Sequence, residues 1–554
     1  MSGSNSHISI IPYILKKKGV EHIVISPGSR NAPLIKSFYL VFGGNCISIV
    51  DERSAAYYAL GLSLRTLKPA VIITTSGTAV LNLSPAIAEA YHQKVPLLAI
   101  TADRPPEWID QQDNQTIRQK NVFASNIKHS VELPLVTSTK EDLWFAGRLV
   151  NESFNKSISG NPGPVHINIP LKEPLYGEIK KQEDIKIINY STSLAFSVEN
   201  RYVEAWNSSD KIMIVCGQQP PNERLSVAIN QLAFDNRVIV VAEAASNIKG
   251  DKIIDIPEAL LTLPAINDAE NKPDLVIYFG GQVVSKKLKA FLRDKSIKEQ
   301  WYIDQEGRHV DTFQGLTHVV NAEPVLFFES INNKVHVRND SHYSLRWQEM
   351  LIHINKKIKE SLKKVEWSDL LVFSKLVEKI KGNDLIFAGN SSVIRYLQMF
   401  TTEHRTVYSN RGTSGIDGCL STAAGIAKVS DERVYAIIGD VSFIYDSNAL
   451  WNKDLPKNLK IIVINNKGGG IFSLIDGPKK TPYLKQFLNA YHPVRISNIA
   501  EAFGLEYYFS EGESSFNEEF KKLEVSEGAG ILEINTPDNK NHQIFRNFIK
   551  ILGS

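Results

Sequence analysis

The 554-residue chain has little cysteine, little net charge and no long apolar segment. Its three cysteines, Cys46, Cys216 and Cys419, are far apart and show neither disulfide nor metal-ligand spacing, so we expect reduced side chains in a cytoplasmic protein. The net charge of +3 is too small to indicate a nucleic-acid partner. No apolar run reaches the roughly 18 residues that span a bilayer, which predicts no integral membrane segment. The first lysines follow the first apolar positions, an order that predicts no secretory signal.

The hydrophobic content of 43% and the charged content of 22% are those of a globular protein. The chain is too long for one core and predicts several domains. Short β-type runs alternate with helical patterns in three stretches, at residues 1–180, 200–340 and 366–554. Such alternation predicts an α/β protein in which parallel sheets are covered by helices on both faces. The first and last stretches share one plan of strand, Gly/Ser turn and helix, which suggests a duplication.

The individual elements follow from these patterns. The predicted strands are His22–Ser26, Ile47–Val50, Ala70–Thr75, Pro96–Thr101, Val165–Ile169, Ile212–Cys216, Arg237–Val241, Leu275–Phe279, Gln300–Ile303, Asp384–Phe387, Val407–Ser409, Val434–Ile438, Lys460–Ile464, Leu505–Phe509 and Gly530–Ile534. The predicted helices are Arg53–Arg65, Thr78–His92, Lys140–Asn155, Leu225–Phe234 and Lys286–Leu292. The polar segment 177–200 is typical of a linker, and the lysine-rich segment 331–365 predicts a solvent-facing helix.

Residues 436–474 have the pattern of strand, acidic turn, helix, strand and glycine-rich polar turn. Asp440 and Asn466 each follow an apolar β-type run, so both fall at the edge where open α/β sheets bind ligands. A carboxylate and a carboxamide at that edge suit Mg²⁺, and the glycines allow a diphosphate to approach the backbone. A solvated turn with no ligand is the simpler alternative, because acidic strand ends are common.

Polar residues also gather after four predicted strands of the first stretch, at residues 26–31, 51–53, 75–78 and 101–106. Helix capping by Ser, Thr and Asp accounts for many of them. It does not account for Arg30, Arg104 and Arg118, because arginine opposes the dipole at a helix start. Guanidinium groups at one sheet edge indicate an anionic substrate held by bidentate carboxylate pairs.

Further candidates rest on local position. Ser391 and Arg395 are four residues apart at the start of a predicted helix and share a face. Arg411 follows a predicted strand, although ordinary salt bridges would account for either arginine alone. Glu52 precedes a helix of small and aromatic residues. It is either a first-turn carboxylate favoured by the helix dipole or a partly buried functional acid.

Several segments together resemble one enzyme family: SPGSRNAPL, DERSAAYYALGLS, TSGTAVLNLSPAIAEAYHQKVPLLAITADRPPE, NQTIRQ, SNRGTSGIDGCLSTAAG, GDVSFIYDSNAL and NNKGGGIFSLI. They are similar to the 2-succinyl-5-enolpyruvyl-6-hydroxy-3-cyclohexene-1-carboxylate synthases, thiamine-diphosphate-dependent enzymes of menaquinone biosynthesis. The similarity is dense in the first and last thirds of the chain and thin in the middle third. The GDG and NN of the superfamily's diphosphate motif are matched here except that Val441 replaces the third glycine.

The resemblance implies three doubly wound domains: a pyrimidine-binding domain at 1–180, a central domain at 200–340 and a diphosphate-binding domain at 366–554. It also implies a homodimer or homotetramer with active sites at subunit interfaces. Mg²⁺, or Mn²⁺ in its place, would be held by Asp440, Asn466 and the carbonyl of Gly468. Glu52, from the neighbouring subunit, would hydrogen-bond the aminopyrimidine ring of thiamine diphosphate. The other implied cofactor contacts are Ser442, Ile471 and Phe472.

The implied substrates are two dicarboxylates, 2-oxoglutarate and isochorismate. 2-Oxoglutarate would lose CO₂, and its four-carbon remainder would add in a 1,4 sense to isochorismate. Motif matching assigns the 2-oxoglutarate side to Ser391, Arg395 and Arg411. It assigns isochorismate and the bound adduct to Ser29, Arg30, Arg104 and Gln115, and further substrate contacts to Lys286, Ile471 and Phe472. Lys287 stands where the family has arginine and lacks its bidentate fork, which leaves that substrate contact open.

Two other interpretations stay open. Acetohydroxyacid synthases and 2-oxoacid decarboxylases use the same cofactor, but they act mostly on monocarboxylic substrates and have less use for arginines at strand ends. Some of these relatives bind FAD, yet no dinucleotide fingerprint follows Ile212–Cys216. A non-catalytic binding protein would not need Glu52, Asp440 and Asn466 together. The chain shows no Ser-His-Asp or Cys-His arrangement, which agrees with cofactor chemistry. Residues without an assigned role are Gln305, Glu306, Arg308 and Asp311.

Overall fold

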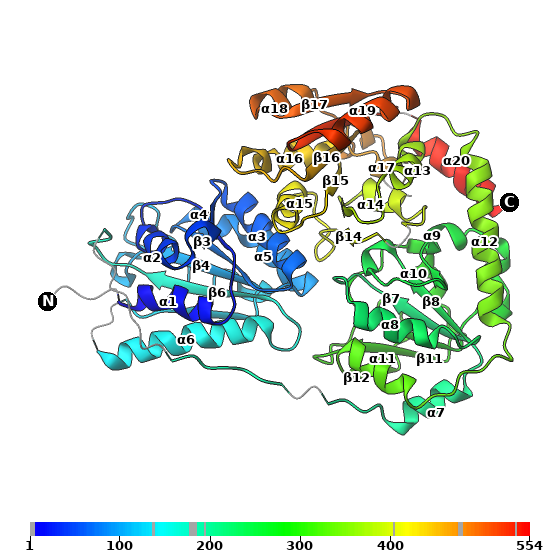
Figure 1. Ribbon diagram of the computed structural model, residues 1–554, viewed down its shortest axis with the longest axis horizontal. Coiled ribbons are helices and arrows are strands. Elements are labelled where there is room, and N and C mark those ends of the chain that lie inside the picture. The colour runs from blue at the N-terminus through cyan, green and yellow to red at the C-terminus, as the bar shows by residue number, and fades with distance from the viewer. Residues whose placement is uncertain are drawn as a thin grey trace. The chain divides into compact units, whose positions relative to one another are not determined.

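The computed structural model describes residues 6–135, 139–176, 186–192, 195–402, 405–474, 480–537 and 540–554. Contacts divide the chain into two compact units (Figure 1). The first unit consists of residues 1–192, 410–431 and 443–459, and the second of residues 193–409, 432–442 and 460–554. Part of the predicted linker lies outside the described residues, because its positions 177–185 and 193–194 are not among them.

The first unit contains a six-stranded parallel sheet in the order β2-β1-β3-β4-β6-β5. Its strands are β1 (Ile23–Ile25), β2 (Cys46–Ser48), β3 (Ala70–Thr74), β4 (Leu97–Asp103), β5 (His129–Glu132) and β6 (Pro164–Pro170). Its helices are α1 (Ser6–Lys17), α2 (Ala32–Phe42), α3 (Glu52–Thr66), α4 (Thr78–Asn82), α5 (Ser84–Gln93), α6 (Lys140–Ile158) and, from the later segment, α15 (Cys419–Lys428). Strands β3, β4 and β6 are buried along their whole length, because helices cover both faces.

Helices α3 and α15 touch through their backbones. A Cβ atom on Gly61 would lie 2.1 Å from the carbonyl oxygen of Thr422, and a Cβ on Gly425 would lie 2.1 Å from that of Tyr58. Glycine is therefore required at both positions for the two helices to approach this closely. The contact fixes the helix that begins at Glu52 against the segment that follows Arg411.

The second unit contains two six-stranded parallel sheets. The first has the order β12-β11-β10-β7-β8-β9, the doubly wound order of dinucleotide-binding folds. Its strands are β7 (Ile212–Cys216), β8 (Val238–Ala242), β9 (Ile253–Ile254), β10 (Leu275–Phe279), β11 (Glu299–Asp304) and β12 (His318–Asn321). Its helices are α7 (Asn200–Ser208), α8 (Glu223–Leu232), α9 (Pro257–Leu260), α10 (Lys286–Leu292), α11 (Pro324–Asn332) and α12 (Tyr343–Leu362).

The last sheet has the order β14-β13-β15-β16-β18-β17. Counted from the first strand of each sheet, this order is the same as in the first unit, which supports the predicted duplication of plan. Its strands are β13 (Leu385–Ala388), β14 (Val407–Tyr408), β15 (Val434–Gly439), β16 (Leu459–Asn465), β17 (Glu506–Ser510) and β18 (Gly530–Asn535). The helices are α13 (Asp369–Lys379), α14 (Ser392–Leu397), α16 (Asp440–Tyr445), α17 (Ile471–Leu474), α18 (Ile496–Ala502), α19 (Glu513–Val525) and α20 (Asn541–Gly553).

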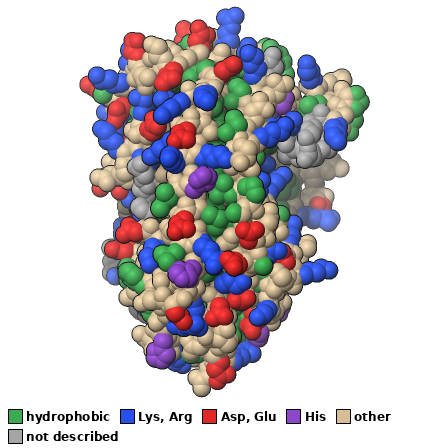
Figure 2. All heavy atoms as spheres, turned by 90° about the vertical axis from the view of Figure 1, so that its right-hand side faces the viewer, with side chains coloured by type: hydrophobic (Ala, Val, Ile, Leu, Met, Phe, Trp, Pro, Cys, Tyr) green, Lys and Arg blue, Asp and Glu red, His purple; other side chains and the backbone are tan. Residues whose placement is uncertain are grey.

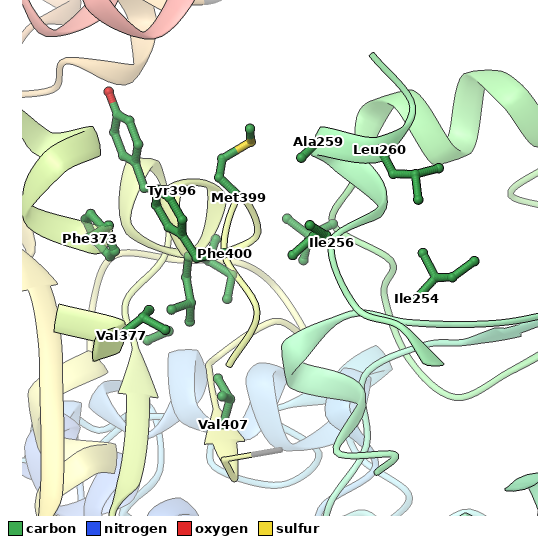
Figure 3. Close-up of a cluster of buried hydrophobic side chains, with 14 of the residues drawn as sticks. Ile254, Ile256, Ala259, Leu260, Phe373, Val377, Tyr396, Met399, Phe400 and Val407 are labelled. Atoms are coloured by element: carbon green, nitrogen blue, oxygen red, sulfur yellow. The ribbon is translucent and has the colours of Figure 1, made fainter. Parts of the chain in front are cut away.

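One apolar core runs through both sheets of the second unit. It contains Ile254 and Ile256 beside the middle sheet together with Phe373, Tyr396 and Met399 around the last sheet (Figure 3). Helix α14 is anchored in this core, since Val393, Ile394, Tyr396 and Leu397 are all buried. On the face drawn in Figure 2, acidic and basic side chains are interspersed, as the small net charge leads one to expect.

The predicted α/β class is confirmed, and all predicted strands are present. The predicted helix Thr78–His92 is two helices, α4 and α5, which meet at Leu83 before the proline of α5. The short strands β5, β9 and β12 were not predicted, nor were the helices α1, α2, α7, α9, α11, α13, α15, α17, α18, α19 and α20. The charged segment after residue 331 does contain a long half-exposed helix, α12.

Candidate active site

The acidic turn and the amide turn meet at one edge of the last sheet. Asp440 follows β15 and is 2% exposed. Its Oδ1 accepts a hydrogen bond of 2.8 Å from the backbone of Val441, and its Oδ2 accepts one of 2.8 Å from the backbone of Gly468, in the turn after β16. The two turns are thereby joined, as their positions at the ends of neighbouring parallel strands predicted.

The two asparagines of that turn differ in how their amides are used. Asn465 donates to Glu533 at 2.6 Å and accepts from the backbone of Lys467 at 3.0 Å, so both ends of its amide are paired. Asn466 donates from Nδ2 to Asp369 at 2.9 Å. Its Oδ1 is buried and has no hydrogen-bond partner among the described residues. A buried acceptor without a partner is costly, so this oxygen is the one that suits a ligand.

This arrangement fits a divalent cation. A carboxylate at Asp440 and a carboxamide oxygen at Asn466 are hard oxygen ligands of the kind that Mg²⁺ takes. Gly468 has a φ of 135°, and a Cβ there would lie 2.1 Å from the carbonyl oxygen of Asn489. Only glycine allows this turn. The backbone carbonyl of Gly468 is a third possible oxygen ligand. His492 also approaches Asp440, with Nε2 3.2 Å from Oδ2, and that hydrogen bond raises the pKa of His492.

A pocket of about 160 Å³ lies beside this edge. It brings together three predicted residues, Lys286, Arg395 and Ile471. Burial lowers the pKa of the Arg395 guanidinium, and the nearby Glu258 carboxylate opposes that shift. The other lining residues are Glu258, Val284, Ser392, Tyr396, Gln398 and Phe545. A mainly apolar pocket in which two cations outnumber one carboxylate, Glu258, suits a small anion with a short carbon chain.

The pocket adjoins the amide turn. A smaller cavity of about 10 Å³ shares Ser392 and Tyr396 with it and is lined also by Asn466 and Asp369. The predicted Ser391 immediately precedes Ser392 and has a φ of 67°, which is strained for a residue other than glycine. Lys287 does not line the pocket; its backbone N–H donates to Glu258 at 3.3 Å. Phe472, in α17, is half-buried, and Ser442, in α16, is buried.

Two of the predicted arginines lie close together at the edge of the first sheet. Arg30 is 6% exposed, donates to the carbonyl of Leu171 at 3.1 Å and lies 3.3 Å from Glu173. Burial lowers the pKa of Arg30, and the nearby positive charge of Arg104 lowers it further. Arg104 donates to the carbonyl of Asn114 at 2.9 and 3.1 Å. Arg104 also lies 3.3 Å from the carboxylate of Asp113. Two neighbouring guanidinium groups, each with one carboxylate beside it, form a candidate site for an anion.

Gln115 lies in the loop that Arg104 holds. It is exposed, has a φ of 53°, and its backbone would be 3.2 Å from a Cβ placed on Gly77. Ser29 is also exposed at this edge. Arg118 is different, because it is 81% exposed and pairs with Asp110 at 2.9 Å, so its role at the sheet edge stays a prediction.

Glu52 is half-buried at the start of α3 and accepts a bond of 3.3 Å from Asn82. Its neighbours in the chain are both held by the segment after residue 443. Asp51 accepts from Asn448 at 2.6 Å, and Arg53 donates to the carbonyl of Tyr445 at 2.8 Å. The first turn of α3 is therefore fixed on both sides of Glu52.

The predicted site residues fall in both units. The first unit holds Glu52, Ser29, Arg30, Arg104, Gln115 and Arg411. The second unit holds Asp440, Ser442, Asn466, Gly468, Ile471, Phe472, Lys286, Lys287, Ser391 and Arg395. Functional candidates that sequence reasoning missed are Glu258, Asp369 and His492, none of which belongs to a recognisable motif.

The unassigned residues of the middle stretch have structural roles. Arg308 pairs with the buried Asp304 at 3.1 Å, and Asp304 also accepts from the backbone of Glu306. Asp311 accepts from the backbones of Gly315 and Leu316. These contacts close the turns between β11 and β12. Gln305 lies in the same turn.

The topological switch point of the middle sheet is filled by the chain itself. A Cβ on Gly217, after β7, would lie 2.3 Å from the carbonyl oxygen of Gly281, after β10. Gly281 also donates to the carbonyl of Gln218 at 2.7 Å. A dinucleotide would need this crevice open, so the geometry argues against one at this position. Among the described residues, every helix is too short or too polar to reach across a lipid bilayer.

Family models match along most of the chain. Residues 8–122 match the N-terminal TPP binding domain of thiamine pyrophosphate enzymes, residues 179–387 the middle domain, and residues 388–534 the C-terminal TPP binding domain. The chain is 38% identical to a 2-succinyl-5-enolpyruvyl-6-hydroxy-3-cyclohexene-1-carboxylate synthase of Desulfotalea psychrophila, over 96% of this chain and 98% of the relative. Enzymes of the same name in Flavobacterium johnsoniae and Porphyromonas gingivalis are 38% and 34% identical, over 97% and 99% of this chain and 97% of each relative.

Proposed function

Because this chain belongs to the 2-succinyl-5-enolpyruvyl-6-hydroxy-3-cyclohexene-1-carboxylate synthase family, we propose that it catalyses that synthesis in menaquinone biosynthesis, with thiamine diphosphate and Mg²⁺. 2-Oxoglutarate loses CO₂, and the remaining four-carbon unit adds in a 1,4 sense to isochorismate. The observation that carries the proposal is the cationic pocket of Lys286 and Arg395, which adjoins the turn of Asn466. Mn²⁺ is proposed as an alternative cation.

The diphosphate half of the proposed site consists of the two joined turns. Asp440, Oδ1 of Asn466 and the carbonyl of Gly468 are proposed to hold the cation, and the backbone of the glycine-rich turn to face the diphosphate. This assignment is supported by the unpaired buried oxygen of Asn466. When bound, thiamine diphosphate supplies the electron sink for cleaving the carboxyl group from a 2-oxoacid. The remaining cofactor contacts proposed are Ser442, Ile471 and Phe472.

The substrate half is assigned by charge. Arg395 and Lys286 are proposed to bind the carboxylates of 2-oxoglutarate, and Ile471 to exclude water from the reacting end. Arg30 and Arg104 are proposed to bind isochorismate, supported by their mutual repulsion in a partly buried site. The other proposed contacts are Ser29, Gln115, Ser391 and Arg411, whereas Lys287 is left out because its side chain does not line the pocket.

Glu52 is proposed to hold a hydrogen bond to a ring nitrogen of the aminopyrimidine. Its support is its half-buried place at the fixed first turn of α3. We further propose domain limits of 1–180, 200–340 and 366–554, a homodimer or homotetramer whose sites lie at subunit interfaces, and a cytoplasmic location. The oligomer would bring Glu52 of one chain to the Asp440 turn of another.

A substrate-omission assay tests the proposal. The purified protein with thiamine diphosphate and Mg²⁺ should form a product from 2-oxoglutarate plus isochorismate whose mass equals the sum of the two substrates minus CO₂. Pyruvate in place of 2-oxoglutarate should give little product, because it lacks the second carboxylate for the cationic pocket. Product formation from pyruvate at the same rate would favour a monocarboxylate enzyme. Cofactor binding without any product would favour the non-catalytic alternative.

A further inference from the structure

The loop that carries Arg411 is held by a buried carboxylate from a distant part of the first unit. Glu89 lies on α5 and is 0% exposed. Its Oε1 accepts a hydrogen bond of 2.6 Å from the backbone of Gly412. Its Oε2 accepts two more from Thr413, of 2.7 Å from the backbone and 2.6 Å from the hydroxyl. Both backbone bonds begin at the residues directly after Arg411.

A carboxylate is a costly choice for this position. Burying a charge is unfavourable unless it is well hydrogen-bonded, and burial raises the pKa of Glu89. The neighbours of Glu89 on α5, Ala86, Ile87 and Ala90, are buried and apolar, so the helix packs without a charge there. Gln93 on the same helix donates one bond of 3.3 Å to Glu89, and the three shorter bonds that offset the cost of the carboxylate come from the loop in this conformation.

The loop is in direct backbone contact with α5 and is tied down at its far end. A Cβ on Gly412 would lie 2.6 Å from the carbonyl oxygen of Glu89. Asp417, at the other end of the loop, accepts from the hydroxyl of Tyr57 on α3 at 2.8 Å. Gly418 has a φ of 64°, and a Cβ there would overlap the ring of Tyr57 at 2.1 Å. Because both ends of the loop are fixed, the backbone position from which the Arg411 side chain extends is fixed as well.

We propose that Glu89 is a positioning residue for Arg411: by holding Gly412 and Thr413 it sets where the guanidinium of Arg411 is presented to the anionic substrate. The inference rests on the proposed function, in which Arg411 binds the group derived from 2-oxoglutarate. Glu89 itself does not touch the substrate. Its effect is on substrate affinity through Arg411 and not on the binding of the cofactor or the metal, whose proposed ligands lie in other turns.

The variant Glu89→Gln separates this role from packing. Glutamine has nearly the same volume, but its amide NH₂ faces an N–H donor, so one backbone donor of the loop loses its partner. We expect the KM for 2-oxoglutarate to rise about tenfold, which corresponds to one lost hydrogen bond to a charged group. The Kd for thiamine diphosphate in saturating Mg²⁺ should stay within about twofold of the wild type.

Asp446→Asn is the matched control. Asp446 is also a 0% exposed carboxylate of the first unit, and it accepts two bonds from Ser421, at 2.7 and 2.9 Å, in the first turn of α15 after the Arg411 loop has ended. The Asp446→Asn variant should lower the melting temperature, as Glu89→Gln does, but it should leave the KM for 2-oxoglutarate unchanged. Thr413→Val is the milder second variant, because it removes only one of the three bonds from the loop to Glu89 and should raise that KM less.

A double-mutant cycle decides the matter. If Glu89 acts through Arg411, adding Glu89→Gln to an Arg411→Ala protein should change kcat/KM for 2-oxoglutarate by less than about twofold. Additive losses of kcat/KM in the double variant would overturn the inference. An equal rise of the KM for 2-oxoglutarate in Asp446→Asn would overturn it too. Neither result would affect the proposed function. If Glu89→Gln does not fold, the cycle is run with Thr413→Val in its place, and additive or non-additive changes of kcat/KM are interpreted in the same way. A folded wild-type protein that does not turn over 2-oxoglutarate would overturn the proposed function and this inference with it.

Discussion

The side-chain amide nitrogen of Asn466 lies 2.9 Å from the Asp369 carboxylate, and this bond decides which end of the amide is left for a ligand. Asp369 is 2% exposed and accepts a second bond of 2.6 Å from Thr536. Because an ionised carboxylate only accepts hydrogen bonds, Asn466 must turn its NH₂ toward Asp369 and its oxygen away. A supporting group of this kind orients a metal ligand without touching the metal.

Replacing Asp369 by asparagine should therefore weaken the metal site. The new amide can donate as well as accept, so Asn466 is free to turn over and present NH₂ where a cation needs oxygen. We expect the Kd for Mg²⁺, read from Mg²⁺-dependent binding of thiamine diphosphate by calorimetry, to rise about 10- to 100-fold. Glu533→Gln is the control, because Glu533 accepts from Asn465 and from Tyr507 and its replacement leaves the bond between Asn466 and Asp369 in place. An equal loss of Mg²⁺ affinity in both variants would contradict the orienting role of Asp369.

Glu52→Gln should separate binding from turnover. Glutamine keeps the size and a hydrogen bond but cannot hold or release the proton, so turnover should fall about 10²- to 10⁴-fold. Binding of thiamine diphosphate should change little, since the proposed metal ligands are intact. Asp51→Asn is the control, because asparagine is also a good N-cap and turnover should stay within a few fold. Unchanged turnover in Glu52→Gln would mean that Glu52 only favours the start of α3.

Arg395→Ala should act on one substrate. The half-buried guanidinium lines the 160 Å³ pocket, and loss of its charged hydrogen bonds to a carboxylate should raise the KM for 2-oxoglutarate about 10- to 100-fold. The Kd for the cofactor should stay within about twofold. Parallel measurement of both constants checks this prediction, and an equal change in the two would move Arg395 out of the substrate pocket.

The neighbouring lysines offer a matched pair. Lys286 lines the pocket and Lys287 does not, although they are adjacent at the start of α10. Lys286→Ala should raise the KM for 2-oxoglutarate about tenfold, the loss expected for one hydrogen bond to a charged group. Lys287→Ala should leave it unchanged. A larger rise of this KM in Lys287→Ala than in Lys286→Ala would contradict the assignment and would mean that Lys287 makes the contact of the arginine found there in the family.

Gly77→Ala should disturb the isochorismate side. Gly77 has a φ of 82°, and its Cβ would come within 3.2 Å of the Gln115 backbone. A φ of 82° with a ψ of −144° is a conformation that residues other than glycine avoid, so a side chain there costs roughly 1–3 kcal/mol of backbone strain and pushes on the loop that carries Gln115. We expect a higher KM for isochorismate and a normal KM for 2-oxoglutarate from initial-rate kinetics. Gly19→Ala, also at positive φ but with nothing within 4 Å, is the control for strain alone.

The central strands of the three sheets could be predicted from the sequence, whereas three of the edge strands could not. Strands β7 and β10 have the predicted bounds, because both are unbroken apolar runs that are buried on both faces. Strands β5, β9 and β12 lie at sheet edges or next to them, and the residues of β5 are only half-buried, so no apolar run marks it. Helix α1 was missed because isoleucines and Pro12 hide its helical period.

The candidate site was predictable where a strand ends in a polar turn. Asp440 and Asn466 were found in this way, because the ends of parallel strands meet at one edge. Asp369, Glu258 and Glu89 were not found, since each lies on a helix and its partner is far away in the chain. Their roles depend on which backbone groups face them, and that information exists only in the folded chain.

The central claim is that one dicarboxylate is decarboxylated and joined to another. The most direct measurement follows CO₂ released from 2-oxoglutarate and isochorismate consumed in the same reaction, with thiamine diphosphate and Mg²⁺ present. The account predicts equal amounts of the two, and no isochorismate consumption when 2-oxoglutarate, the cofactor or the metal is left out. Release of CO₂ without any loss of isochorismate, or no reaction by a folded protein that binds the cofactor, would contradict it.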